Sequence, residues 1–300
     1  MRARSRAWAL LLAPTLLLAA CGGDGGDGGT QATTPPQPAK VTVTASASGD
    51  QVKFDLPAQI KPGATELTLV NNLKEPAEFQ LTQLDEGHTL AEFYPVIESE
   101  EGLPIPTWLH ASGGVGETAP GASGTVVVDL KAGKYEFFSA SAPEQEGATP
   151  QYKRGGAGSF EVTGDPSGAQ LPATDAQIKA LELGPTDYQF ETSGLKAGTN
   201  QVTFTNGGAQ LHHALMFKLG EGATIDQASE FFTTEDYKGP PPVEFDSATG
   251  SSAVLDKGGS QVATITLESG SYALLCFITD REGSPPHVIK AKMIQEVKVP

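Results

Sequence analysis

Short runs of alternating apolar and polar residues, separated by turn signals, extend along most of this chain. The clearest are KVTVTAS, TELTLVNN, GTVVVDL, NQVTFTN, QVATITL and IQEVKV. A period of two between turn residues is typical of short β-strands. Helical pattern is confined to HTLAEFYPVI (88–97) and TIDQASEFF (224–232). The chain is therefore predicted to be all-β, with few helices.

Part of this pattern occurs twice. The stretch IKPGATELTLVNNLKEPAEFQLTQLDEGHTL (60–90) aligns without a gap with LKAGTNQVTFTNGGAQLHHALMFKLGEGATI (195–225), at an offset of 135 residues. A second pair, LKAGKYEFFS (130–139) and LESGSYALLC (267–276), aligns at an offset of 137. An internal repeat of this kind predicts two copies of one domain. We place them at 41–163 and 180–300, joined by a linker at 164–179, each with one short helix.

Both copies carry the motif L-x-x-G-x-Y before their penultimate strand. Its members are Leu130, Gly133 and Tyr135 in the first copy, and Leu267, Gly270 and Tyr272 in the second. A tight Gly turn followed by an inward Tyr is a common way for a Greek-key sandwich to turn a corner. The sequence therefore predicts two tandem antiparallel β-sandwiches.

The N-terminus has the pattern of a secretory signal. Arg2, Arg4 and Arg6 precede AWALLLAPTLLLAA, an apolar run too short to span a membrane. The run ends in Leu-Ala-Ala-Cys21, which resembles the lipobox of bacterial lipoproteins, in which the cysteine is acylated. The alternative is an ordinary cleavage site with a chance cysteine.

The lipobox resemblance implies a place in the cell envelope. Residues 1–21 would be the lipoprotein signal and its lipidation cysteine, and the Gly- and Pro-rich stretch 22–40 a flexible tether. Membrane lipid would be reached through acylated Cys21. We expect the protein on the outer face of the cytoplasmic membrane or in the periplasm.

The charge balance limits the choice of partners. Of the 20 basic residues three leave with the signal, so 17 remain against 36 acidic residues, a net charge near −19. Nucleic acid is not expected as a partner, whereas a cationic redox or envelope protein, or a metal ion, would be attracted. The alternative is that the acidity only keeps the protein soluble.

The repeat also predicts which side chains of the second copy face inward. In AEFQLT of the first copy, Ala77 and its alternate neighbours are apolar, whereas Glu78 is charged and faces outward. Ala77 corresponds to His212, which is therefore the predicted inward histidine. His213 remains the alternative, because its own alternate neighbours are apolar.

The same comparison applies to Cys276. It corresponds to Ser139, which alternates with outward Glu136 and therefore faces inward. With Cys21 acylated, Cys276 is the last free thiol, so no intramolecular disulfide is possible.

An inward His212 on one strand and an inward Cys276 at the end of another, followed by His287 and Met293, bring four ligand types to one end of a sandwich. A thiolate, two imidazoles and a thioether are the ligands of a type 1 copper site. The sequence therefore predicts one copper ion in the second copy. A zinc ion, or a set of core residues without metal, are the alternatives.

The second copy resembles the cupredoxins, the plastocyanin and azurin type of blue-copper domain. The resemblance rests on an Asn-bearing turn at Asn206, a strand-end Cys276, His287 after a proline, and Met293 in a short following loop. It implies His212, Cys276 and His287 as equatorial ligands and Met293 as the axial ligand. It also implies electron transfer or copper handling.

Two features depart from the cupredoxin pattern. Ten residues separate Cys276 from His287, more than small electron carriers usually have, and Lys292 stands where Gly commonly precedes the methionine. The first copy lacks these ligands, because their places are taken by Ala77, Ser139 and the stretch 151–158. We therefore expect one copper site in the chain, in the second copy.

The leading interpretation is thus a membrane-anchored extracytoplasmic copper protein. The alternative is a binding or scaffold lipoprotein built on cupredoxin folds that hold no metal. Catalysis is not expected, because the sequence carries no Ser/His/Asp signature, no phosphate-binding Gly loop and no exposed, activated thiol.

Overall fold

The computed structural model describes residues 35–99, 102–143, 145, 147–234, 236–245, 250–283 and 285–300. The predicted signal, Cys21 and the tether up to residue 34 lie outside these residues. No helix in the described part of the chain is long and apolar enough to span a bilayer.

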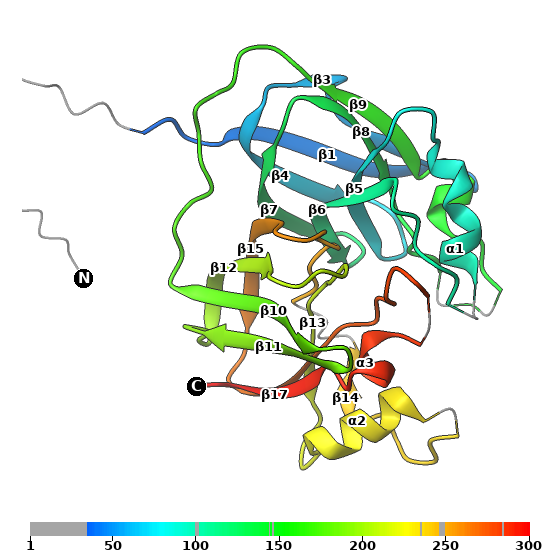
Figure 1. Ribbon diagram of the computed structural model, residues 1–300, viewed down its shortest axis with the longest axis vertical. Coiled ribbons are helices and arrows are strands. Elements are labelled where there is room, and N and C mark those ends of the chain that lie inside the picture. The colour runs from blue at the N-terminus through cyan, green and yellow to red at the C-terminus, as the bar shows by residue number, and fades with distance from the viewer. Residues whose placement is uncertain are drawn as a thin grey trace, which may run out of the picture. The chain divides into compact units, whose positions relative to one another are not determined.

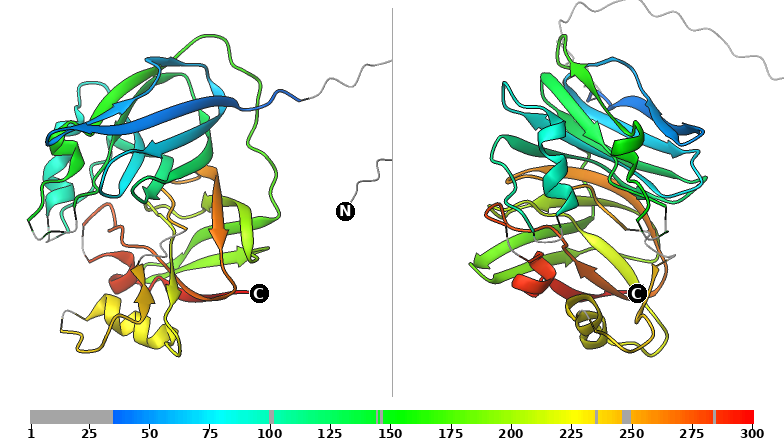
Figure 2. Two further views of the ribbon diagram at one scale, coloured as in Figure 1. Left: turned by 180° about the vertical axis from the view of Figure 1, so that it is seen from behind. Right: turned by 90° about the vertical axis from the view of Figure 1, so that its right-hand side faces the viewer.

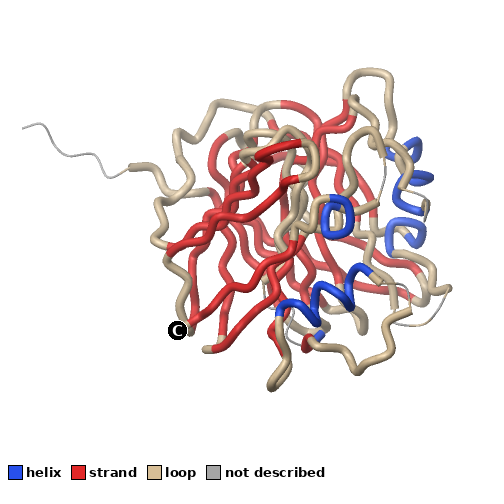
Figure 3. Tube along the Cα trace, turned by 60° about the horizontal axis from the view of Figure 1, so that its bottom comes forward, coloured by secondary structure: helices blue, strands red, loops and turns tan. Residues whose placement is uncertain are grey.

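Short strands form most of the regular secondary structure in the described residues, as predicted, and the helices are few and short (Figure 3). The strands are β1 Ala39–Ser48, β2 Gln51–Asp55, β3 Gln59–Ile60, β4 Gly63–Asn71, β5 Ala77–Leu84, β6 Leu109–Thr118, β7 Ser123–Leu130, β8 Gly133–Phe138, β9 Ala157–Val162, β10 Ala176–Gly184, β11 Asp187–Ser193, β12 Gly198–Asn206, β13 Leu215–Leu219, β14 Val243–Glu244, β15 Ser260–Leu267, β16 Gly270–Leu275 and β17 Ile294–Val299. The helical segments are η1 Leu90–Glu92, α1 Tyr94–Glu98, η2 Gln151–Arg154, α2 Ile225–Thr233 and α3 His287–Lys290.

The two copies repeat one topology. One sheet of the first copy has the strand order β2-β1-β4-β7, in which β1 and β4 are parallel. The second copy repeats this order as β11-β10-β12-β15, in which β10 and β12 are parallel. The opposing sheets have the orders β3-β9-β8-β5-β6 and β14-β13-β16-β17. Apolar side chains of facing sheets form the core, as in a Greek-key sandwich.

The copies share one continuous sheet, which the sequence does not predict. Strand β7 pairs with β15, so the two four-stranded orders join into a sheet of eight strands (Figure 1). Val126 pairs with Ala263, 137 residues further on, the separation that also relates Leu130 to Leu267. Equivalent strands therefore meet antiparallel, and the copies are related by an approximate two-fold axis.

The L-x-x-G-x-Y motif turns the same corner in both copies. Gly133 and Gly270 have φ of 141° and 146°, a region that favours glycine. The tyrosines that follow, Tyr135 and Tyr272, are buried. Each phenolic oxygen accepts a hydrogen bond at 3.0 Å from a backbone N–H four residues upstream, which secures the corner.

The segment between the copies runs along the outside of the strands (Figures 1 and 2). Its first part is hydrogen-bonded to the first copy, where Ala64 N donates to Ala169 O at 3.1 Å. β1 begins at Ala39 and β10 at Ala176, a few residues before the starts of the two predicted copies.

Both predicted helices form, at η1 and α1 and at α2. Each copy also has a second helical turn, so the expectation of one helix per copy needs correction. These turns, η2 and α3, each follow a proline, Pro150 or Pro286. They span four residues, too few for a helical period to be visible in a sequence.

Candidate metal centre

His212 is held by a backbone bridge and by the turn that precedes it. Its N–H donates to Leu255 O at 3.1 Å, and its carbonyl accepts from Leu255 N at 2.9 Å. In the turn the buried Asn206 amide donates to Gln210 O and Leu255 O, at 2.7 and 2.9 Å. The side-chain oxygen of Asn206 accepts from Gly208 N. These contacts shape the Asn-bearing turn that the sequence indicated.

Backbone hydrogen bonds bring the other three predicted ligand residues together. Cys276, just beyond β16, donates its N–H to Met293 O at 3.2 Å and accepts from Val288 N at 2.9 Å. Met293 N donates to His287 O at 3.1 Å. Although ten residues separate Cys276 from His287 in the sequence, the loop they form returns to the end of the strand, where His287 N donates to Ile278 O at 2.8 Å and α3 begins.

His212, Cys276 and His287 converge in the core. One ligand atom from each lies within 4.8 Å of the others, and in the described part of the chain no other group of three such residues does this. Cys276 Sγ lies 3.6 Å from His287 Nδ1, which lies 3.2 Å from His212 Nδ1. All three side chains and that of Met293 are fully buried.

Two carboxylates determine which nitrogens carry the imidazole protons. His212 Nε2 lies 3.0 Å from Glu182 Oε1, and His287 Nε2 lies 3.0 Å from Asp280 Oδ1. An ionised carboxylate only accepts hydrogen bonds, so each Nε2 carries the proton. Burial lowers the pKa of His212 and lowers that of His287 to about 3, so both rings are neutral. Each Nδ1 therefore presents a lone pair to the other ring.

The thiol completes the set of donors. Burial raises the pKa of Cys276 to about 12, so the thiol keeps its proton until a metal replaces it. Two imidazole lone pairs and a thiol that face each other in a dry interior form a site for a soft or borderline cation. Copper fits this donor set, with the thiolate and both imidazoles as ligands and Met293 as the thioether.

Asp280 supports His287 and is itself fully partnered. The Tyr188 hydroxyl donates to Asp280 Oδ1 at 3.1 Å, and Lys290 pairs with the other oxygen. The Tyr188 ring packs edge-on against both imidazoles, with centroids 5.7 Å from His212 and 4.9 Å from His287. Such outer contacts fix ring orientation and tune the metal. No spacing in the sequence pointed to Glu182, Tyr188 or Asp280.

The alternative histidine has another role. His213 lies outside the cluster, and its Nε2 accepts a hydrogen bond from Phe277 N at 2.8 Å. Burial lowers its pKa to about 3, so the ring is a neutral acceptor. Lys292, which departs from the cupredoxin pattern, is exposed and has a φ of 49°. The glycine that commonly stands there adopts this conformation without strain.

The first copy keeps the backbone of the site without its ligands. Ser139 N donates to Gly156 O at 2.9 Å, and Gly156 N donates to Gln151 O at 2.7 Å. These bonds match those of the second copy. Ser139 takes the place of Cys276, Gly156 that of Met293, and Gln151 that of His287. Ala77 stands in the place of His212. The first copy therefore has no comparable donor set.

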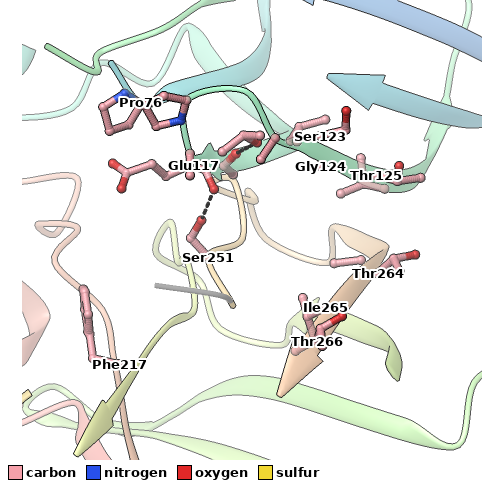
Figure 4. Close-up of a pocket in the computed structure, with 18 of the residues that line it drawn as sticks. Pro76, Glu117, Ser123, Gly124, Thr125, Phe217, Ser251, Thr264, Ile265 and Thr266 are labelled. Atoms are coloured by element: carbon pink, nitrogen blue, oxygen red, sulfur yellow. Dashed lines mark hydrogen bonds between the residues drawn. The ribbon is translucent and has the colours of Figure 1, made fainter. Parts of the chain in front are cut away.

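A separate open cleft lies between the two copies (Figure 4). Its volume is about 1020 Å³, and Glu117, Ser251 and Phe217 are among its lining residues. The Ser251 hydroxyl donates to the Glu117 carbonyl across it, at 3.3 Å. None of the four predicted ligands lines this cleft.

Comparison with known proteins found likeness in structure alone. No family model matches the sequence, and no curated protein matches it. Among solved structures, auracyanin from the photosynthetic bacterium Roseiflexus castenholzii is 25% identical, with a TM-score of 0.26; the match covers 43% of this chain and 99% of auracyanin.

Two larger copper proteins also match. A multicopper oxidase is 12% identical with a TM-score of 0.23, the match covering 87% of this chain and 88% of the oxidase. The copper nitrite reductase of Nitrosomonas europaea is 14% identical with a TM-score of 0.25, the match covering 88% and 94%. At scores this low the likeness carries no weight by itself.

The strand order and the buried cluster give the classification. The chain is built of two Greek-key sandwiches, and between the sheets of the second lie two histidines, a cysteine and a methionine. This is a cupredoxin-like fold, as the sequence predicted. The buried cluster is consistent with one type 1 copper site in the second copy.

Proposed function

We propose that this protein transfers electrons through one type 1 copper site in its second copy, held at the outer face of a membrane. The observation that carries the proposal is the convergence of two neutral imidazole Nδ1 atoms and the Cys276 thiol in a sealed interior. A scaffold that uses the fold alone has no need to direct two lone pairs at each other. Without a metal the Cys276 thiol can donate to His287 Nδ1, 3.6 Å away, and the His212 lone pair then faces that nitrogen with no cation between the two rings.

Complete burial favours electron transfer over copper delivery. A copper chaperone must pass its ion to a partner, so its ligands need access to the surface. Here the four side chains are inaccessible and the two imidazoles are fixed by carboxylates. A rigid site changes little between oxidation states, which suits electron transfer. The same burial leaves no room for a substrate at the metal, so we propose a carrier rather than an enzyme.

Loading with copper tests the proposal. The chain without its first 21 residues would be purified metal-free, titrated with Cu(II) and followed by visible absorption and metal analysis. We expect an intense thiolate-to-copper band at one copper per chain, and its loss in Cys276→Ala. The matched control is Ser139→Ala, which changes the equivalent residue of the first copy. A protein that keeps no stoichiometric copper, or stays colourless with copper bound, would refute the electron-transfer proposal.

Membrane anchoring needs its own experiment, since it rests on the sequence before residue 22. The full chain and its Cys21→Ser variant would be expressed in a bacterium and fractionated. We expect the full chain in the membrane fraction, labelled by a fatty-acid probe, and the variant unlabelled. Equal labelling of both would show that Cys21 is not the acylated residue.

A further inference from the structure

Arg281 binds the first copy from within the ligand loop of the second. It follows Asp280, the partner of His287. Its guanidinium donates from Nη1 to Pro106 O at 2.8 Å and from Nη2 to Leu109 O at 3.2 Å. Nη2 also donates to Asp256 Oδ2 at 2.6 Å. A planar guanidinium can serve three such acceptors at once, whereas a lysine ammonium cannot match this fork.

The backbone of Arg281 extends these ties in two directions. Its carbonyl accepts from Ile105 N of the first copy at 2.9 Å. Its N–H donates to Gln210 Oε1 at 2.7 Å, and Gln210 N donates to Glu182 Oε1 at 2.7 Å. Glu182 is the carboxylate that holds His212. Arg281 is thus linked to the supports of both imidazoles, to Glu182 by hydrogen bonds through Gln210 and to Asp280 as its neighbour in the chain.

The first copy also supports His212 directly. Leu255, which bridges His212, lies in a segment hydrogen-bonded to β6, with Gly113 N donating to Val254 O at 3.0 Å and Asp256 N donating to Ala111 O at 2.9 Å. Leu211, the residue before His212, is buried in an apolar cluster whose other buried members all belong to the first copy. They are Leu90, Phe93, Ile105, Leu109, Ala111, Phe138 and Tyr152.

We propose that the metal-free first copy is a fixed wall of the copper site, with Arg281 as the positioning residue that holds the ligand loop against it. The inference rests on the proposed copper site and gives the first copy a role in it. A loop of ten residues between two ligands loses much conformational freedom when it is ordered. The hydrogen bonds of Arg281 to the first copy do not depend on the metal. They offset this loss of conformational entropy and hold His287 in place.

The test compares two arginines in similar surroundings. Arg281→Ala removes the guanidinium hydrogen bonds at the ligand loop, and Arg154→Ala removes a guanidinium within the first copy. The side chain of Arg281 is 16% exposed and pairs with Asp256; that of Arg154 is 17% exposed and pairs with Glu75. Both changes remove a partly buried ion pair, so Arg154→Ala shows the effect of losing such a pair away from the ligand loop. Arg281→Lys serves as a milder variant that keeps the charge.

Three measurements are made on the chain without its signal: the rate of copper loss to a chelator, the electron paramagnetic resonance spectrum of the Cu(II) form, and backbone hydrogen exchange of the metal-free form. In Arg281→Ala we expect copper loss at least about tenfold faster, as for other outer-contact changes. We also expect an altered copper hyperfine splitting and faster exchange at Val288 and Met293. Arg281→Lys should be intermediate, and Arg154→Ala unchanged in all three.

The outcomes separate the inference from the proposed function. If the wild type binds copper with an intense visible band and Arg281→Ala matches it in release rate, spectrum and exchange, the inference is overturned and the copper site stands. If the wild type binds no copper, the proposed function fails. The exchange comparison then still decides whether Arg281 fixes the loop. Should Arg281→Ala fail to fold, an Arg281→Lys protein identical to the wild type in all three measurements overturns the inference.

Discussion

The Nδ1 atoms of His212 and His287 face each other 3.2 Å apart in an interior closed to solvent. With both Nε2 protons directed at carboxylates, two lone pairs oppose each other at this distance. A cation between them converts a repulsive contact into two bonds. The pair therefore links metal binding to the stability of the fold.

Copper should accordingly stabilise the protein strongly. A ligand that binds only the folded state, at a free concentration about 1,000 times its Kd, adds about 4 kcal/mol to the free energy of unfolding. We expect a gain of this order in chemical denaturation with Cu(I) under reducing, anaerobic conditions. Chelation should reverse the gain, and His212→Ala should abolish it. Equal stability with and without copper would contradict the site.

The two adjacent histidines should differ in the effect of their loss. His212→Ala removes a ligand, so the visible band should disappear. His213→Ala leaves the Phe277 N–H without its acceptor, which costs about 1–3 kcal/mol of folding free energy, yet one copper per chain should still bind with its colour. Absorption titrations and urea denaturation measure the two effects. Loss of colour in His213→Ala with colour retained in His212→Ala would reverse the assignment.

The two supporting carboxylates should contribute unequally to copper affinity. The Asp280 side chain is 4% exposed and also holds Tyr188 and Lys290, whereas that of Glu182 is 15% exposed, so water can replace it more easily. Competition with a chromogenic Cu(I) chelator should show affinity about 10–100-fold lower in Asp280→Ala. The loss in Glu182→Ala should be smaller. Asp236→Ala, with a side chain 91% exposed, is the control and should bind as the wild type.

Lys292 should matter for the backbone and leave the copper unaffected. A lysine in the left-handed region costs about 1 kcal/mol, so Lys292→Gly should be neutral or stabilise the protein by up to about that amount. Because the side chain is exposed, the reduction potential should not change. Lys298→Gly, in β17, is the contrasting control and should destabilise. A clear shift in potential on Lys292→Gly would place the ammonium near the copper.

Glu78, which is hydrogen-bonded to Ser139 in the first copy, should make stability depend on pH. Burial is the main reason that its pKa is raised to about 7. Between pH 4.5 and 7 the folded chain then binds a proton that the unfolded chain lacks. The free energy of unfolding should therefore fall as pH rises through this window.

Glu78→Gln provides the comparison, because its amide oxygen can still accept from Ala140 N. The full pKa shift corresponds to about 3 kcal/mol, and partial exposure reduces it, so at pH 8 the variant should be more stable than the wild type by about 1–3 kcal/mol. Below pH 4.5 the two should converge. Parallel pH profiles of the variant and the wild type would disprove the assignment.

The sequence by itself predicted the all-β class, the repeat and the inward direction of His212 and Cys276. Side-chain alternation on a strand is a local property, and the buried apolar positions Ala77, Phe79 and Leu81 of the first copy bear out the alternation that was carried over to the second. The motif around Tyr135 and Tyr272 was equally readable, because a Gly turn and its tyrosine lie within a few residues.

The tertiary structure alone revealed the shared eight-stranded sheet, the carboxylates Glu182 and Asp280, and the contact of Arg281 with the first copy. Glu182 lies 30 residues from His212, and Arg281 lies 172 residues from Leu109. Such pairs depend on how whole sheets pack and on the path of each loop between them. No local pattern of apolar and polar residues predicts that packing, because the packing depends on the burial of many side chains that are far apart in the sequence.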